Sequence, residues 1–428
     1  ICSRLTAITV DPSNTAYSSS EGVLFNKDQK TLVQFPCGKA GNYTIPAGVG
    51  RIDVSAFGGC RLLTNVIIAD SVTDIDYGAF VNCRGLTSVT LPNSITNLAD
   101  SAFSYCTSLT NVNLPESIVH VGEGPFAVCY QLMTITVNAD NPVYASLDGV
   151  LFDKGLNRLI QYPAGRAGSY TIPASVTNIG SGAFHGSKGL TDVAIPDNIT
   201  TLPYWVFTGC GSLTNLTIPN QLTSLEDWAF DGCRSLTSIV IPNSVTNLGN
   251  WAFNSCGSLT SVRIGNQVTQ IGSLAFNSCT SLVNVTIPAS VTKLGNKAFG
   301  NCRQLAGVYF QGNAPGLGSG VFDSDELAIV YYLPGTSGWG ASTLENRPAV
   351  LWNPRIQTGN LTFGVQTNGF GFEINGNTNL VLVVEACANL ANPSWIPLQT
   401  NTFSNGFSYF NDCQWTNFPA RFYRLRSP

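Results

Sequence analysis

The sequence predicts a mainly β protein: a right-handed solenoid of parallel strands followed by a small antiparallel β-sandwich. Three observations predict this fold class. Cysteines recur every 23 residues, apolar and polar residues alternate after each of these cysteines, and the composition changes after residue 353. Each element is justified below in chain order.

The repeat is defined by nine of the thirteen cysteines, which fall on two series with steps of 23 residues. The members are Cys60, Cys83, Cys106 and Cys129, then Cys210, Cys233, Cys256, Cys279 and Cys302. Ser187 lies 23 residues before Cys210 in the same context, and the gaps from Cys2 to Cys60 and from Cys129 to Ser187 are both 58 residues. A fixed period of about 20–29 residues is typical of leucine-rich solenoids. The spacing therefore predicts a leucine-rich-repeat solenoid over residues 1–311.

Each turn contains one strand with a single buried face. In residues 101–122, SAFSYCTSLTNVNLPESIVHVG, the segment L-T-x-V-x-L alternates apolar and polar residues. The inward positions are Leu109, Val112 and Leu114. Pro115 ends this strand, and a second half-turn supplies the other wall of the core. Because one turn cannot close a core, stacked turns must share it, with strands about 4.8 Å apart.

Two longer segments, residues 10–49 and 137–176, match each other nearly position for position. Each contains G-V-L-F, a polar turn and a second apolar strand that ends in proline, which predicts a β-hairpin. Ordinary turns lie between the two segments. We therefore expect two hairpin insertions in the solenoid and the duplication of a larger unit.

The regular cysteine spacing ends at Cys302. Residues 312–353 are loop-rich and are predicted to form a cap that covers the last apolar layer. Residues 354–428 alternate short aromatic-rich strands with Asn/Gly turns, which predicts a β-sandwich module with most of its aromatic residues in the core.

The repeated cysteines are expected to be a buried column of free thiols. Equivalent Cβ atoms on stacked turns lie about 4.8 Å apart, beyond the usual Cβ separation in a disulfide. No C-x-x-C pair is present to suggest zinc. Cys387 and Cys413 lie outside the repeat and are the candidate disulfide pair.

Composition excludes several classes of function. With 21 basic against 25 acidic residues, the chain has too little positive charge for a nucleic-acid surface. No window of 18 apolar residues predicts a membrane span. The two histidines, His120 and His185, look like surface variants of repeat positions, with no nucleophile or base spaced nearby. We therefore predict no catalytic residue, cofactor or metal site. Because Ile1 is not an initiator methionine, the chain is expected to be processed or a fragment.

The strongest departure from the repeat consensus is aromatic. Before the Ala/Val-Phe pair, most turns carry a small residue, a leucine or a lysine, but three successive turns carry Trp205, Trp228 and Trp251. Tyr204 adjoins the first of them. Stacked turns would align these rings as a ridge about 10 Å long. The ridge is either a self-stacking ladder that stabilises the solenoid or an aromatic platform for a partner or a sugar ring.

The signature A-F-x-x-C-x-x-L-x-x-V-x-L-P, with interspersed Y-x-x-x-x-G-V-L-F segments, resembles the BspA-like class of bacterial leucine-rich repeat surface proteins. The resemblance covers roughly residues 1–311. It implies a secreted or cell-surface adhesive protein that acts through protein contacts, and it names no ligand.

Three functions follow as hypotheses. The first is non-enzymatic adhesion or protein–protein interaction with a protein partner or a host or matrix component, through the extended repeat surface. The second is a self-assembling extracellular filament subunit with head-to-tail solenoid contacts. The third is glycan binding through residues 354–428.

Overall fold

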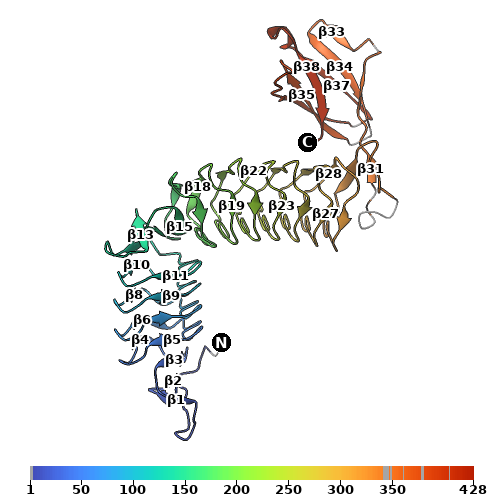
Figure 1. Ribbon diagram of the computed structural model, residues 1–428. Helices are drawn as coiled ribbons and strands as arrows, with labels where there is room; N and C mark the ends of the chain where they lie inside the picture. Colours follow the sequence, from blue (N-terminus) through green and yellow to red (C-terminus); the bar gives the residue numbers. More distant parts are fainter. Residues whose placement is uncertain (1–2, 341–346, 348, 360, 377–379, 404) are drawn as a thin grey trace.

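The computed structural model describes residues 3–340, 347, 349–359, 361–376, 380–403 and 405–428; Cys2 lies outside them. Figure 1 shows a solenoid in two arms that meet at a bend, with a small β domain at the end of the second arm. The predicted mainly β fold is confirmed. Within the described ranges the helical structure is one 3-10 turn, η1 (Trp415–Asn417).

The first arm, residues 41–137, stacks turns that carry a longer strand on one side and a two-residue strand on the other. The longer strands are β4 (Gly41–Thr44), β6 (Leu63–Ile67), β8 (Ser88–Thr90), β10 (Asn111–Leu114) and β12 (Thr134–Val137). The short strands are β5 (Arg51–Ile52), β7 (Asp74–Ile75), β9 (Asn97–Leu98) and β11 (His120–Val121). Val66 pairs with Val89 and Val112 with Ile135, all in parallel, so the 23-residue repeat is also the strand register.

The second arm, residues 168–351, repeats this arrangement. Its longer strands are β16 (Gly168–Thr171), β18 (Leu190–Ala194), β20 (Asn215–Thr217), β22 (Ser238–Val240), β24 (Ser261–Arg263), β26 (Asn284–Ile287), β28 (Gly307–Phe310), β30 (Ile329–Tyr332) and β31 (Ala349–Leu351). Its short strands are β17 (Asn178–Ile179), β19 (Thr201–Leu202), β21 (Ser224–Leu225), β23 (Asn247–Leu248), β25 (Gln270–Ile271), β27 (Lys293–Leu294) and β29 (Gly316–Leu317).

The core of each arm is a set of aligned columns. Leu109, Val112 and Leu114 are buried, as the alternation predicts. Phenylalanines of successive turns stack face to face, for example Phe80 on Phe103 with ring centroids 4.8 Å apart. Such offset stacks contribute about 0.5–1.5 kcal/mol each beyond burial. The cysteine column lies beside them, and each thiol donates to a phenylalanine carbonyl one turn back, as Cys106 does to Phe80 at 3.2 Å.

Both predicted hairpins are confirmed, and each has a third strand. The first hairpin comprises β1 (Tyr17–Ser20), β2 (Val23–Asn26) and β3 (Thr31–Gln34); the second comprises β13 (Tyr144–Leu147), β14 (Val150–Asp153) and β15 (Arg158–Gln161). In each, the last strand pairs in parallel with a short strand of the following arm. The second hairpin lies at the bend, so the solenoid changes direction there (Figure 1).

The segment predicted as a cap continues the solenoid. β29 pairs with β27, β30 with β28, and β31 with β30, all in parallel. Phe322 stacks on Phe299 at 5.9 Å, and Asp325 occupies the next cysteine position, 23 residues after Cys302. The cysteine series ends at Cys302, but the solenoid turn continues through the segment predicted as a cap, with an aspartate in the cysteine position.

The C-terminal module consists of two antiparallel sheets, as predicted. One contains β32 (Arg355–Gln357), β33 (Gly364–Gln366), β34 (Gly369–Asn375) and β37 (Phe407–Asp412); the other contains β35 (Val381–Cys387), β36 (Ile396–Thr402) and β38 (Phe422–Arg426). Phe372 and Phe410 from the first sheet share a core with Leu382 and Val384 from the second.

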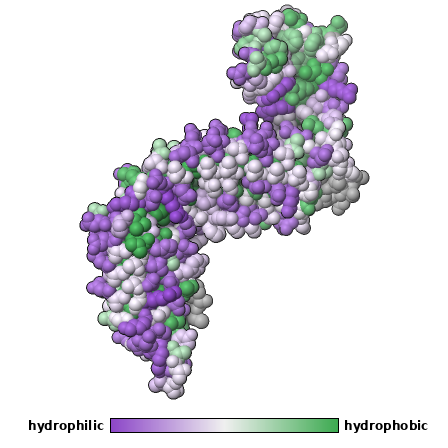
Figure 2. Space-filling view, in the orientation of Figure 1, coloured by the Kyte–Doolittle hydropathy of each residue, from purple (hydrophilic) through white to green (hydrophobic). Residues whose placement is uncertain are grey.

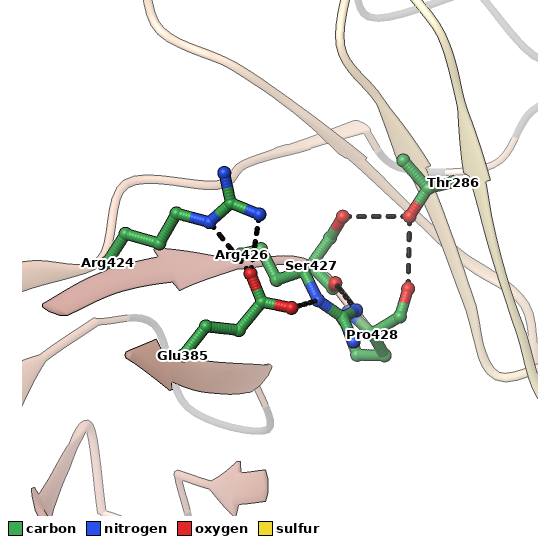
Figure 3. A network of polar contacts seen from close by, with 6 residues as sticks. All are labelled: Thr286, Glu385, Arg424, Arg426, Ser427 and Pro428. Carbon is green, nitrogen blue, oxygen red and sulfur yellow. Dashed lines mark hydrogen bonds and ion pairs between the residues drawn. The ribbon is translucent and has the colours of Figure 1, made fainter. Parts of the chain in front are cut away.

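The end of the chain is fastened to the longer-strand face of the second arm. The Thr286 hydroxyl on β26 lies 2.8 Å from the Ser427 hydroxyl and donates to the Pro428 carbonyl at 3.1 Å (Figure 3). Arg426 donates to the Ser427 carbonyl at 2.7 Å and to Glu385 at 2.6 Å. Glu385 also accepts from Arg424, so this buried carboxylate holds two arginines beside the contact.

Candidate interaction surface

The three tryptophans belong to a column of residues with left-handed backbone. Each lies at the start of the segment that precedes the core phenylalanine, where its N–H donates to a carbonyl of the next turn, as Trp228 does to Asn250 at 2.9 Å. The residues of this left-handed column are Ser55, Gly78, Ser101, Gly124, Gly182, Trp205, Trp228, Trp251, Leu274, Lys297 and Gly320, all with positive φ. The bond between turns therefore requires this conformation whatever the side chain.

This conformation is unfavourable for a bulky residue. A left-handed φ costs a residue with a Cβ about 1–2 kcal/mol, and glycine avoids that cost. Four turns carry glycine there, whereas Trp205, Trp228 and Trp251 hold φ values of 56°, 57° and 53°. A strained position occupied by three large side chains indicates a compensating role.

The structure brings the three indole rings together as a tryptophan ladder (Trp205, Trp228 and Trp251). The ring centroids of Trp205 and Trp228 lie 5.5 Å apart at 24°, and those of Trp228 and Trp251 lie 4.8 Å apart at 8°. Tyr204 tilts against Trp205 at 6.0 Å. The predicted alignment is thus confirmed, while the binding role of these residues stays a prediction.

The indole rings of the ladder expose mainly their edges to solvent. Trp228 has a stacked neighbour on both faces, and both it and Trp251 are half-buried, while Tyr204 and Trp205 are each 43% exposed. The next residue of the column beyond Trp205 is Gly182, which has no side chain to cover the ring. A sugar stacked flat on an indole is therefore limited to the ends of the ladder, whereas a protein partner can pack along its edges.

The surroundings of the ladder are acidic. No lysine or arginine occurs between Lys188 and Arg234, whereas this stretch contains Glu226, Asp227 and Asp231. The negative charge of Glu226, and the hydrogen bond that it accepts, raise the pKa of the exposed Tyr204 hydroxyl. Asp227 accepts from the Asn250 backbone at 2.6 Å and so remains fixed beside the rings.

The longer-strand face, which does not include the ladder, is polar and mostly neutral. In the orientation of Figure 2, apolar residues gather at the bend and on the C-terminal module, and the second arm between them is largely polar or neutral. At the end of this face Tyr309 and Tyr331 replace the small residues of other turns, and the C-terminal module buries both. Sequence analysis missed this docking site, although G-V-Y-F and I-V-Y-Y place two tyrosines at outward positions.

Neither histidine forms part of a reactive cluster. His120 is exposed on β11. His185 is half-buried near the bend rather than at the surface, burial lowers its pKa to about 4, and its ring meets that of Tyr105 edge-on at 6.1 Å. In the part of the chain that the structure describes, no three His, Cys, Asp or Glu side chains could hold a metal ion.

Eight cysteines of the column are buried free thiols, as predicted. Burial raises the pKa of Cys83, Cys129 and Cys210 to about 12, so these thiols are poor nucleophiles. The prediction is wrong for Cys60, which is bonded to Cys37. Their Cα atoms lie only 4.2 Å apart because Cys37 follows the hairpin, where the chain approaches more closely than one strand spacing.

The predicted disulfide between Cys387 and Cys413 is not formed. Cys387 is buried at the end of β35, where its sulfur lies 3.8 Å from the Asn389 carbonyl. Cys413 is exposed just after β37, which belongs to the other sheet of the module. Cys387 therefore lies in one sheet, and Cys413 lies just beyond a strand of the other.

The sequence matches a family model described as "BspA type Leucine rich repeat region" in six copies, over residues 34–145, 165–240 and 203–328. No curated protein matches the chain significantly. No helix within the described ranges is long and apolar enough to cross a membrane.

Solved structures support the same fold. The pneumococcal vaccine antigen PcpA is similar with a TM-score of 0.54 and 19% identity, over 81% of this chain and 99% of that one. A leucine-rich repeat protein from Eubacterium ventriosum is similar with a TM-score of 0.55 and 20% identity, over 78% and 97% of the two chains. Because the family match spans more than half of the sequence, the chain belongs to the BspA-type leucine-rich repeat family.

Proposed function

We propose that this protein is a secreted or cell-surface protein without enzymatic activity that mediates adhesion or protein–protein contact through its solenoid surface. Within that surface, the tryptophan ladder and Tyr204 are the contact site for a protein partner or a host or matrix component. The observation that carries the proposal is the placement of three tryptophans at positions where the backbone favours glycine.

A stabilising role alone does not account for this placement. The buried phenylalanine column already provides continuous stacking through the second arm at no cost in left-handed backbone. The ladder gains about 0.5–1.5 kcal/mol per ring pair, and the backbone strain offsets much of that gain. Partly exposed tryptophan and tyrosine side chains are the residues most enriched at binding hot spots.

The acidic surroundings favour a partner of opposite charge. Glu226 and Asp227 lie close to the exposed Tyr204, so a basic surface that packs against this end of the ladder gains electrostatic complementarity. Salt would then slow association, because steering between charged surfaces is screened within about 8–10 Å.

The disulfide supports an extracellular location. Bonds such as Cys37–Cys60 persist in oxidising compartments and are rare in the reducing cytosol. In the second copy of the hairpin unit, Ala164 and Ser187 take the two positions, so both cysteines are absent together. A joint replacement is expected of two residues that act as a bonded pair.

The test is a Trp228→Ala, Trp251→Ala double variant of the full chain, assayed for binding to extracellular matrix laid down by cultured epithelial cells. We expect a loss of binding of tenfold or more, since hot-spot truncations cost about 2 kcal/mol or more. Circular dichroism should show a folded solenoid. Leu274→Ala with Lys297→Ala, in the same column beyond the ladder, is the matched control, and unchanged binding of the tryptophan variant would remove the site.

Glycan binding by the C-terminal module is a second candidate. Most of its aromatic residues were expected in the core, yet Phe407 and Tyr409, two positions apart on β37, are 54% and 44% exposed. Ile396 on the other sheet is also exposed, so apolar surface is present for stacking. A glycan array probed with the full chain and with a Phe407→Ser, Tyr409→Ser variant tests this, and an array without signal would dispose of it.

A further inference from the structure

The end of the second arm and the C-terminal module enclose a cavity between them. The strand register places Thr286, Tyr309 and Tyr331 in one outward column on β26, β28 and β30. The two tyrosine rings stack with centroids 4.8 Å apart and are each 3% exposed. Thr286 bonds to Ser427 and Pro428 of the module (Figure 3). The module is therefore held against this column at three successive turns, and the cavity lies beside that contact.

The size of the cavity fits a single ring. Its volume is about 190 Å³. An apolar cavity of about 150 Å³ binds one benzene molecule, so the larger volume leaves room for one small substituent on such a ring. Gln311, which is exposed, also lines the cavity, so the cavity is reached from solvent on that side. The lining residues that matter for recognition are Tyr309, Tyr331, Leu333, Trp352, Leu425 and Arg426.

One wall carries a hydrogen-bond donor without an acceptor. The indole Nε1 of Trp352 is buried, and within the described ranges it makes no hydrogen bond. The Trp352 backbone N–H donates to Tyr332 at 2.7 Å, and its ring meets that of Tyr309 edge-on at 6.4 Å, so this side chain is held in place. A buried N–H without an acceptor is unfavourable because it has lost its hydrogen bond to water. A ligand oxygen that accepts from Nε1 therefore gains stability.

The module contributes positive charge to the cavity. The buried Glu385 carboxylate accepts from the Nε atoms of Arg424 at 2.7 Å and Arg426 at 2.6 Å (Figure 3). Two guanidinium groups around one carboxylate leave one net positive charge. Arg426 Nη1 donates to the Ser427 carbonyl at 2.7 Å, whereas Nη2 has no partner in the part of the chain that the structure describes. The side chain of Arg426 is 41% exposed, and no acidic residue is among the described residues that line the cavity.

We infer that this cavity binds a small carboxylate with an apolar six-membered ring, an aromatic acid of about the size of phenylacetate. The carboxylate accepts hydrogen bonds from Arg426 and from the Trp352 Nε1–H, and the ring packs against Tyr331, Leu333 and Leu425. Because the solenoid and the module each supply part of the site, the ligand also stabilises the contact between them. The cavity lies on a different face from the tryptophan ladder, and its ligand is independent of the partner proposed there.

A sugar acid is a poorer occupant. Each ring hydroxyl loses hydrogen bonds to water when it enters the cavity and needs a polar partner in exchange. Leu333 and Leu425 offer none, and the Ser427 hydroxyl is already paired with Thr286. An apolar ring with one carboxylate therefore matches these walls better.

The experiment titrates the full chain with phenylacetate, followed by NMR signals of the ligand. We expect saturable binding at one site with a Kd of about 1 mM or tighter. Phenylacetamide has nearly the same shape without the charge and should bind about tenfold or more weakly. Glucuronate, a sugar acid, should show no saturable binding.

Hydrogen exchange locates the site. A ligand at ten times its Kd should slow exchange about tenfold at amides of β30 and β38 that open only when the module separates from the arm. Amides of β20 and β22, which lie away from the cavity, should exchange at an unchanged rate and are the internal control.

Substitutions identify the contacts. Trp352→Phe keeps a ring and removes the N–H, and should weaken binding about threefold to tenfold. Arg426→Gln should weaken it about tenfold or more. Arg424→Gln is the matched control, because it removes the same charge from the same cluster without removing a group that lines the cavity, and it should weaken binding less than about threefold. Circular dichroism checks that each variant is folded.

Three results would overturn the inference. The first is the absence of saturable phenylacetate binding to the parent chain. The second is binding that survives both Trp352→Phe and Arg426→Gln, or that Arg424→Gln weakens as much as Arg426→Gln does, since a direct contact requires Arg426 itself. The third is binding of glucuronate or phenylacetamide as tight as that of phenylacetate.

Discussion

The two arms are built from the same 23-residue turn and differ in two columns. The first arm begins with the Cys37–Cys60 disulfide and carries only serine and glycine in the left-handed column. The second arm has Ala164 and Ser187 at the disulfide positions and the tryptophan ladder in that column. The buried phenylalanines are common to both. The difference teaches that the core columns carry the fold, whereas the disulfide positions and the left-handed column vary between the arms without changing the turn.

The largest expected effect tests whether the two cores are equivalent. Phe80→Ala in the first arm and Phe253→Ala in the second remove fully buried rings that stack on both sides. Each should lower the free energy of unfolding of its arm by about 3–5 kcal/mol. Urea unfolding followed by hydrogen exchange measures both. A cost several kcal/mol smaller in one arm would show that the cores differ after all.

A further difference in stability between the arms is expected from the disulfide of the first arm. Cys37→Ala with Cys60→Ser copies the residues of the second arm and should cost the first arm about 3 kcal/mol, from the lost constraint on the unfolded chain. Thermal melts with and without a reductant measure it. The reciprocal variant, Ala164→Cys with Ser187→Cys, tests whether the second arm accepts the bond. A melting temperature of the parent that is indifferent to reductant would contradict the prediction.

The stability of the end of the second arm should depend on pH. Asp325 is fully buried at a cysteine position, and burial raises its pKa to about 7 from 3.8. Because the folded state holds this proton more tightly than the unfolded state, stability falls as pH rises from about 4 to 7 and is level above that. The change in the free energy of unfolding should be on the order of 4 kcal/mol.

Asp325→Cys restores the column and provides the control for that pH dependence. The nearby charges are Asp323, which raises the pKa further, and Arg347, which lowers it. Hydrogen exchange at β29 and β30 between pH 4 and 8, corrected for intrinsic rates, measures the effect. The same pH dependence in Asp325→Cys would assign it to another group.

The smallest expected effect is a difference in stability between two variants of Trp228, which distinguishes the cost of backbone strain from the gain of ring stacking. Trp228→Gly relieves a left-handed backbone and loses two ring stacks, so its stability should stay within about 1 kcal/mol of the parent. Trp228→Ala keeps the strain and loses the stacks, and should be less stable than the glycine variant by about 1 kcal/mol. Thermal melts compare the two. Equal stability of both variants would show that the backbone at this position is not strained.

Much of the fold follows from local pattern. The spacing of Cys83 and Cys106 predicts the register, and the alternation of Leu109, Val112 and Leu114 predicts the buried face. Because these features recur in every turn, the strand register and buried face predicted for one turn can be checked against the other turns. The alignment of the tryptophan ladder follows from the same arithmetic.

The features that sequence analysis missed are those in which one turn meets something unlike itself. Asp325 breaks the cysteine series, whereas the phenylalanine series continues from Phe299 to Phe322 and marks the same turn. The Cys37–Cys60 bond was detectable, since the two are 23 residues apart and both are absent from the second copy. The docking of Tyr309 against the C-terminal module depends on long-range packing that no repeat specifies.

The bend was also beyond prediction. Glu123, at the end of the first arm, forms an ion pair with Arg158 of the second hairpin. It also accepts from the backbone N–H of Ser181 in the second arm at 2.6 Å. Ser181 lies 58 positions from Glu123, which is the length of the gap from Cys129 to Ser187, whereas the 35 positions to Arg158 match no repeat of the sequence.

A 23-residue turn is much longer when its chain is extended than when it is folded in the solenoid. Each turn occupies about 4.8 Å of the axis but spans about 80 Å when its chain is pulled straight. Tension applied along the axis loads the hydrogen bonds between one turn and the next, so turns peel away singly from an end. The molecule would therefore extend in steps under flow while the tryptophan ladder, in the middle of the second arm, stays folded. The Cys37–Cys60 crosslink would limit that extension in the first arm.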